Sequence, residues 1–133
     1  MTTEIDEHDT FVASLKEKYP EMYDNVYCGI SISEGWYEII YHLSSSIYSH
    51  CKFKKIDYPK VAQIKEKFGG LRFYVDGGDD FTHGAIQMAE NWASRTCETC
   101  GVRGQRRSGG WLRTLCDKHE VERQENMKER NNA

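Results

Sequence analysis

The sequence has no apolar run near the roughly 18 residues that a membrane span needs. Its first ten residues, MTTEIDEHDT, are acidic and polar, which does not fit a secretory signal. It contains neither a glycine-rich phosphate loop nor a Gly-x-Ser-x-Gly nucleophile turn. These absences argue against a membrane protein, a secreted protein and several common enzyme classes. With 133 residues, we expect one compact domain with a small metal module, located in the cytoplasm and not an enzyme.

Four residues with the chemistry of metal ligands stand near the C-terminal end. Cys97 and Cys100 are separated by two residues, and fifteen residues follow before the second pair. That second pair is Cys116 and His119, again with two residues between them. Two such pairs are typical of tetrahedral zinc, and Gly101 suits the tight turn after the first pair. We predict a structural Zn²⁺ site without a catalytic residue, because four protein ligands close the coordination sphere.

The other two of the five cysteines do not form a disulfide framework, which favours a reducing compartment. They are Cys28 and Cys51. One interpretation is a second metal site, formed by these two cysteines and His50, which precedes Cys51. Free buried thiols are the simpler interpretation.

The net charge of −3 conceals an uneven distribution. Residues 1–94 carry nine basic and fifteen acidic side chains, a net of −6, whereas residues 95–119 have a net of +4. Residues 95–119 thus form a basic finger on an acidic body, residues 1–94. Such a finger can bind nucleic acid, an acidic protein or the N-terminal half of its own chain. The candidate binding residues in the finger are four arginines and a tryptophan available for stacking: Arg103, Arg106, Arg107, Arg113 and Trp111.

Apolar periodicity predicts three helices, over about residues 10–19, 33–54 and 81–94, after a frayed segment at 1–9. Along the second helix, tyrosines lie beside the apolar stripe, where they complete the edge of the core or form a contact surface. These tyrosines are Tyr37, Tyr41 and Tyr48. The inward face of the third helix is predicted to consist of Ala85, Ile86, Ala89, Trp92 and Ala93.

The strongest hairpin signal covers residues 61–76, with Gly69-Gly70 suited to a type I′ turn. This register pairs Phe68 with Leu71 and makes one face of the hairpin apolar. The other face carries basic side chains that are either solvated or follow a phosphate backbone. They are Lys65, Lys67 and Arg72.

Glu66 falls on the apolar face of this hairpin, opposite Phe73. A buried carboxylate without a partner is costly, so we expect a structural ion pair or hydrogen bond. The alternative is a functional carboxylate that acts as a general acid or base. A three-residue loop would instead place Glu66 opposite Arg72.

Parts of the chain resemble known patterns. The CxxC knuckle, the expected hairpin after it and the ligand pair at a helix start resemble the treble-clef class of zinc finger, over residues 96–130. KEKFGGLRFYV, TCETCG and GGWLRTLCDKH also resemble a group of small, mostly uncharacterised proteins of bacteriophages and bacteria, over about residues 58–119. That resemblance implies a phage or prophage origin, the four metal ligands above and a hairpin packed with the finger.

The predicted fold class is α+β. Residues 1–94 form a body of helices packed on the hairpin, and residues 95–133 form a treble-clef-like zinc module with a C-terminal helix. The first functional hypothesis is a phage-encoded binding protein that engages and modulates a host protein, for instance by inhibiting a defence system. The alternatives are a nucleic-acid-binding zinc-finger protein and a metal-dependent hydrolase or nuclease that uses Glu66. The expected partner is thus a macromolecule, a host protein ahead of nucleic acid, and no membrane is involved.

Overall fold

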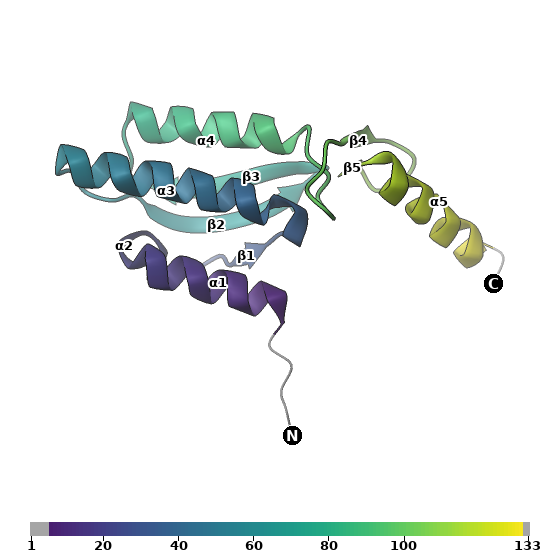
Figure 1. Cartoon of the computed structure of the whole chain (residues 1–133), viewed down its shortest axis with the longest axis horizontal. Coiled ribbons are helices and arrows are strands. Elements are labelled where there is room, and N and C mark those ends of the chain that lie inside the picture. The colour runs from purple at the N-terminus through teal and green to yellow at the C-terminus, as the bar shows by residue number, and fades with distance from the viewer. Residues whose placement is uncertain (1–5, 132–133) are drawn as a thin grey trace, which may run out of the picture.

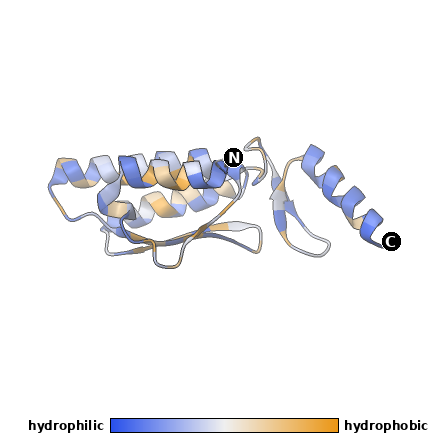
Figure 2. Cartoon of the chain, turned by 90° about the horizontal axis from the view of Figure 1, so that it is seen from below, coloured by the Kyte–Doolittle hydropathy of each residue, from blue (hydrophilic) through white to orange (hydrophobic). Residues whose placement is uncertain are grey.

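Helices lie on one side of a three-stranded sheet, and a small module with its own hairpin and helix follows them (Figure 1, Figure 2). A computed structural model describes residues 6–131 of the chain. The fold is mixed α+β, as predicted. In chain order its elements are α1 (Glu7–Lys18), α2 (Pro20–Tyr23), β1 (Ile30–Ser31), the 3-10 turn η1 (Glu34–Trp36), α3 (Tyr37–Lys54), β2 (Lys60–Lys67), β3 (Gly70–Asp76), α4 (Asp80–Ala93), β4 (Gln105–Arg107), β5 (Arg113–Leu115) and α5 (Asp117–Asn131).

Short-range signals explain where the body helices begin and end. The Asp6 carboxylate accepts a hydrogen bond from the His8 N–H and caps α1, and the helix ends before Pro20. Helix α1 therefore includes residues 7–9, which the sequence analysis expected to be frayed, whereas residues 1–5 lie outside the described part. Asp79 caps α4 in the same way, by accepting from the Thr82 N–H. No helix within residues 6–131 is both long and apolar enough to cross a membrane.

The sheet has the order β1-β2-β3, in which β1 runs parallel and β3 antiparallel to β2. The short strand β1 was not predicted, because two residues give no readable alternation of apolar and polar side chains. Ile64 lies at the centre of the sheet, with Ile30 as its partner on one side and Phe73 on the other. These pairs place the middle of β2 in the body core.

The predicted turn of the β2–β3 hairpin is misplaced by one residue, which shifts the partner of each β2 residue by two residues. The turn residues are Phe68 and Gly69, with φ angles of 54° and 79°, and Lys67 pairs with Gly70. Phe68 is consequently 61% exposed instead of packing on the apolar face. Contacts from the metal module fix the turn at this position, since the Thr114 hydroxyl donates to the Gly69 carbonyl at 2.6 Å.

The tyrosines of α3 complete the edge of the core rather than forming a free surface. The Tyr37 ring stacks on Phe11 of α1 with 3.9 Å between centroids, and Tyr48 packs near Tyr19 and Tyr58. The largest fully buried apolar side chains of the body come from α1, α2, η1, α3 and the sheet: Leu15, Met22, Tyr23, Trp36, Ile39, Ile40, Ile47, Val61, Ile64 and Leu71.

Helix α4 differs from its prediction at one position. Ile86, Ala89 and Ala93 face the core as expected, but Trp92 is 45% exposed. Its ring lies beside His42 of α3 on the outer surface of the two helices. The sequence misassigned Trp92 because it lies about 100° from Ala93 around the helix, at the boundary of the apolar face.

Candidate metal centre

The four predicted ligands converge on one point. The sulfur atoms of Cys97, Cys100 and Cys116 and a ring nitrogen of His119 all lie within 4.8 Å of one another. The His119 Nδ1 atom is 3.6 Å from the Cys97 sulfur and 3.2 Å from the Cys116 sulfur. The Cys100 and Cys116 sulfurs are 3.8 Å apart. This arrangement is a plausible site for one metal ion, and within residues 6–131 it is the only such cluster of His, Cys, Asp and Glu side chains.

Local backbone geometry brings the first ligand pair together. The Cys97 N–H donates to the Val102 carbonyl at 2.7 Å, and the Gly101 N–H donates back to the Cys97 carbonyl at 2.9 Å. These bonds close a tight turn in which Gly101 has a φ of 85°, a conformation that favours glycine. A Cβ at Gly101 would also lie 3.1 Å from the Gly35 carbonyl oxygen of the body. The glycine after the CxxC pair thus serves both the turn and its packing.

The second pair is positioned by β5 and α5. Cys116 directly follows β5, and His119 lies in the first turn of α5, which starts at Asp117. The antiparallel pairing of β4 with β5 returns the chain from the first pair to the second. The site therefore joins the knuckle, the hairpin and the helix of the module.

The electrostatics of the site suit bound metal. Burial raises the pKa of the Cys97 thiol, but the backbone N–H groups of Cys116, Cys100 and Thr99 outweigh this effect and lower the pKa to about 6. Thiolate is the form of cysteine that ligates metals. The Nε2 atom of His119 lies 3.9 Å from a Glu122 carboxylate oxygen, in the position of an outer partner that orients a ligating imidazole.

Glu98, inside the CxxC pair, is a structural residue that the sequence analysis missed. The residue is 6% exposed, and its carboxylate accepts from the Arg113 Nε at 2.7 Å and from the Thr114 N–H at 3.3 Å. Its backbone N–H and carbonyl bond to Thr114 and Gly35, respectively. Glu98 thus ties the knuckle to both β5 and the body. No sequence signal marked it, because a glutamate between two cysteines is expected to be solvated.

The arginines of the module divide into two groups. Arg113 is paired with Glu98, and the Arg107 Nη2 is 2.7 Å from an Asp117 carboxylate oxygen. Arg103 and Arg106 are exposed, and neither forms an ion pair with a described carboxylate. A cleft of about 420 Å³ lies at the β4 edge, and its lining includes four arginines and one carboxylate. These residues are Arg95, Arg103, Arg106, Arg107 and Asp117.

The basic side chains of the body hairpin do not join this cleft. Lys65 pairs with Arg72 across the strands, and Lys67 lies 5.8 Å from the centre of the Phe68 ring. The Arg72 Nη1 donates to the carbonyl of its neighbour Leu71 at 3.1 Å. These three residues therefore do not line the cleft of the module arginines, and their role on a phosphate-binding surface stays a prediction.

Glu66 has a local structural contact. One of its carboxylate oxygens accepts from the Gly69 N–H at 3.0 Å, inside the hairpin turn. The side chain is half-buried and lies opposite Leu71, not opposite Phe73 or Arg72 as the two considered registers required. This hydrogen bond supports the structural interpretation of Glu66.

A second site at Cys28, His50 and Cys51 is not assembled. Cys28 is exposed and Cys51 is buried. His50 instead contacts Asp79 through its Nε2 atom at 2.7 Å and stacks on Phe81. The His50 contact, followed by hydrogen bonds from Thr82, lowers the pKa of Asp79 below its ordinary range. This cluster fastens the C-terminal end of α3 to the start of α4.

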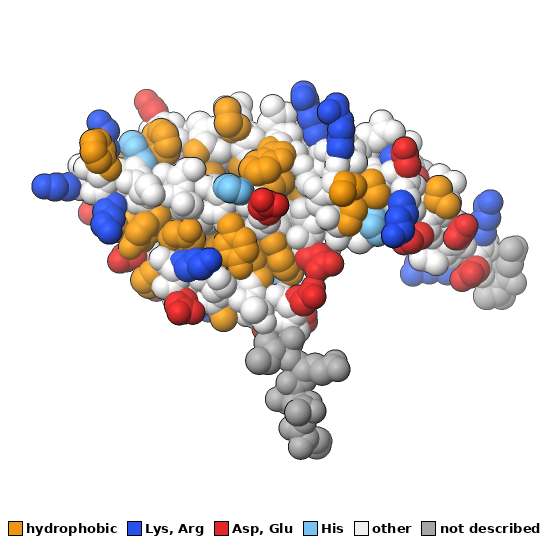
Figure 3. All heavy atoms as spheres, viewed as in Figure 1, with side chains coloured by type: hydrophobic (Ala, Val, Ile, Leu, Met, Phe, Trp, Pro, Cys, Tyr) orange, Lys and Arg blue, Asp and Glu red, His pale blue; other side chains and the backbone are white. Residues whose placement is uncertain are grey.

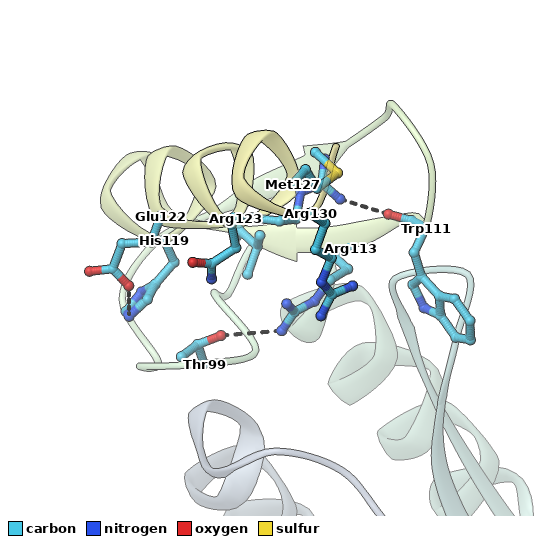
Figure 4. A pocket seen from close by; sticks show the side chains of 10 residues that line it. Thr99, Trp111, Arg113, His119, Glu122, Arg123, Met127 and Arg130 are labelled. Atoms are coloured by element: carbon cyan, nitrogen blue, oxygen red, sulfur yellow. Dashed lines mark hydrogen bonds and ion pairs between the residues drawn. The ribbon is translucent and has the colours of Figure 1, made fainter. Parts of the chain in front are cut away.

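A groove of about 620 Å³ lies between α5 and the hairpin of the module (Figure 4). Trp111 stands at one end of it and is 74% exposed. The Arg123 guanidinium donates to the carbonyls of Trp111 and Ser108, which ties the β4–β5 loop to α5. Met127 and Arg130 also line this groove.

In comparisons with known proteins, no protein-family model, no curated protein and no solved structure matches this chain.

Proposed function

We propose that this protein binds nucleic acid through the arginine cleft of a zinc-stabilised, treble-clef-like module. The observation that carries the proposal is the pair Arg103 and Arg106, both exposed and both without a described carboxylate partner, in a cleft with two further arginines. Four arginines against the single carboxylate of Asp117 leave an excess of positive charge where phosphates can bind.

The distances at the metal centre support zinc as the ion. Tetrahedral zinc with bonds of about 2.3 Å to sulfur and about 2.0 Å to nitrogen requires roughly 3.8 Å between sulfurs and roughly 3.5 Å between sulfur and nitrogen. The Cys100–Cys116 and Cys97–His119 distances are 3.8 and 3.6 Å, and the Cys116–His119 distance is shorter, at 3.2 Å. A knuckle, a hairpin and a ligand pair at the start of α5 are the parts of a treble clef. Four ligands leave no open position for substrate, so zinc supplies rigidity here.

The placement of the arginines favours nucleic acid over the host-protein hypothesis. The helices of the acidic body supply no ion-pair partner to the arginines of the module within the described residues. The partners of Arg107 and Arg113 are Asp117 and Glu98, which belong to the module itself. Figure 3 shows basic side chains exposed where the C-terminal end of α4 meets the module.

The test is binding of fluorescent DNA and RNA oligonucleotides, single-stranded and duplex, measured by anisotropy at several salt concentrations. Each phosphate contacted on duplex DNA contributes a slope of about −0.9 to the plot of log affinity against log salt. Replacing Arg103 and Arg106 together by alanine is expected to weaken binding about tenfold and to reduce the slope by about two.

The matched control replaces Lys52 and Lys54, two exposed basic residues at the end of α3. This double alanine variant removes the same charge but lies far from the cleft in Figure 1, so its affinity should equal that of the unmodified chain. No binding to any oligonucleotide at low salt, or equal losses in both variants, would refute the proposal.

Modulation of another protein is the second candidate function, and the exposed Trp111 favours it. Tryptophan, arginine and methionine are enriched at protein interfaces, and Trp111, Arg130 and Met127 line one groove. Figure 4 shows the indole directed away from the α5 helix.

If this groove binds a protein, affinity capture from a host lysate should return one partner reproducibly. Replacing Trp111 by alanine should remove that partner at unchanged stability, because a buried tryptophan anchor contributes about 2 kcal/mol or more to binding. Replacing Val121, another exposed apolar residue of the module, should leave capture unchanged. Repeated captures without any specific protein would argue strongly against this candidate.

A further inference from the structure

Helix α4 carries a second apolar stripe that the described chain covers only in part: Phe81 stacks on His50, Trp92 lies beside His42, and Ala85 is partly buried against the core. Phe81, Ala85, Met88 and Trp92 recur at intervals of four, three and four residues, the spacing of a helix-packing seam. This stripe is separate from the buried one formed by Thr82, Ile86, Ala89 and Ala93. Phe81 is 47%, Met88 74% and Trp92 45% exposed. Figure 3 shows hydrophobic side chains exposed along α4 on this face.

The surface around the stripe is almost free of charge, although 29% of the residues in the chain are charged. Between Phe81 and Ser94 the only Asp, Glu, Lys or Arg is Glu90, whose carboxylate accepts from the Phe73 N–H of the sheet. The exposed residues of α3 beside the stripe are mostly neutral, comprising one histidine and serines: His42, Ser45, Ser46 and Ser49. The one acidic residue on this face of α3 is Glu38, which lies 3.5 Å from the His42 ring nitrogen. Protein interfaces are likewise depleted in charge at their core and enriched in aromatic residues and methionine.

The stripe is complementary to itself when a second helix runs antiparallel. A twofold axis near the middle of α4 places Phe81 opposite Trp92 of the second copy, because both lie equally far from the centre. The same axis places Ala85 opposite Met88 of the second copy, so that a small residue receives a long one. A twofold interface uses one patch twice, and this patch meets that requirement.

The charges at the ends of α4 agree with this arrangement. Asp80 stands at the start of the helix and Arg95 follows its end. Both are exposed, and neither forms an ion pair with another residue of the described chain. In an antiparallel pair, each Asp80 lies near the Arg95 of the other copy. A parallel pair would bring like charges together at both ends.

From this seam we infer that two copies of the chain form a twofold-symmetric homodimer through antiparallel packing of α4 against α4. The interface also covers the shallow groove between α3 and α4, whose lining includes Ile39, Leu43 and Ala89 and three residues of the stripe, Ala85, Met88 and Trp92. Arg103 and Arg106 do not line this groove, whereas Arg95 also lines the arginine cleft of the module. Met88→Glu changes no residue of that cleft, so with this variant a failure of the dimer is distinguishable from a failure of nucleic-acid binding.

The first test is sedimentation equilibrium of the metal-loaded full chain over a range of micromolar concentrations. The expected result is a species of twice the 15.5 kDa chain mass. Met88→Glu should convert it to a monomer, because a carboxylate would be buried opposite Ala85. Val121→Glu, at a 56% exposed site on α5, should leave the dimer intact. Circular dichroism shows whether both variants stay folded.

The second test examines the antiparallel register by charge exchange. Asp80→Arg and Arg95→Asp each create like-charge pairs at both ends and should weaken dimerisation by about tenfold. The double variant restores opposite charges and should dimerise as the unmodified chain does. A chain that stays monomeric overturns the inference and leaves the stripe to a helix of another protein. A dimer that is insensitive to Met88→Glu, or singles that the double variant does not rescue, also overturn it.

Discussion

Removal of the metal is expected to unfold residues 95–131 while the body stays folded. The apolar cluster of the module consists of only three buried residues, and two of them are the ligands Cys97 and Cys116. Burial of the third residue, Leu115, stabilises the module by too little to offset the conformational entropy lost when residues 95–131 become ordered. Apparent binding free energies of structural zinc are about 10–16 kcal/mol, which exceeds the stability of most whole domains.

Hydrogen exchange measured with and without a strong chelator tests this prediction. Amide protection in β5 and α5 should disappear on chelation, whereas protection in α3 and β2 should persist, because their core is separate and much larger. Metal analysis should find one ion per chain. The Cys116→Ser variant should no longer bind that ion. The Cys28→Ser variant should still bind it, because Cys28 is exposed and is not part of the cluster. Unchanged protection of the module in metal-free protein would contradict the prediction.

Replacing Gly35 by alanine is expected to destabilise the chain by about 3 kcal/mol or more, because it creates a clash that cannot relax locally. A Cβ at Gly35 would overlap the Cys97 carbonyl oxygen and lie 2.5 Å from the Glu98 carbonyl carbon. These atoms belong to the backbone of the metal knuckle and cannot rotate away as a side chain does. The Gly35 N–H also donates to the Glu98 carbonyl at 3.0 Å, and the neighbouring Trp36 Nε1 donates to the Thr96 carbonyl.

Thermal unfolding provides the measurement, with an expected fall of the midpoint by about 10 °C for a chain of this size. Gly84→Ala is the matched control: nothing lies within 4 Å of its Cβ position, and it occupies the interior of α4. It should stabilise the chain by about 0.5–1 kcal/mol through helix propensity. If Gly35→Ala melts at the temperature of the unmodified chain, the body and the knuckle are not packed as described.

The sequence predicted the metal ligands well because ligand geometry is set locally. Two residues between Cys97 and Cys100 allow both sulfurs to face one ion, and the same holds for Cys116 and His119. Binding of one ion by both pairs then limits the distance in space between the first ligand pair and the second. The helices were predicted for a similar reason, since caps such as Asp79 and stops such as Pro20 act within a few residues.

The hairpin was predicted to exist, but its turn was misplaced because the deciding contact is distant in the chain. Both Phe68-Gly69 and Gly69-Gly70 allow a two-residue turn, and glycine at two positions made the second choice favourable. Thr114 lies 45 residues further on, and its bond to the Gly69 carbonyl selects the other turn. Phe68 accepts a positive φ as a result, which is rare for a residue with a large side chain.

The amino-acid sequence alone determined the ligand set, the α+β class and the separation of an acidic body from a basic module, because each depends on residue spacing or composition. Tertiary structure decided which charges remain free and which surfaces remain open. Glu98 and Asp117 neutralise two arginines and leave Arg103 and Arg106 available, and α3 covers only part of the second apolar stripe of α4. Such outcomes depend on which segments meet in space, and no local pattern in the chain encodes that.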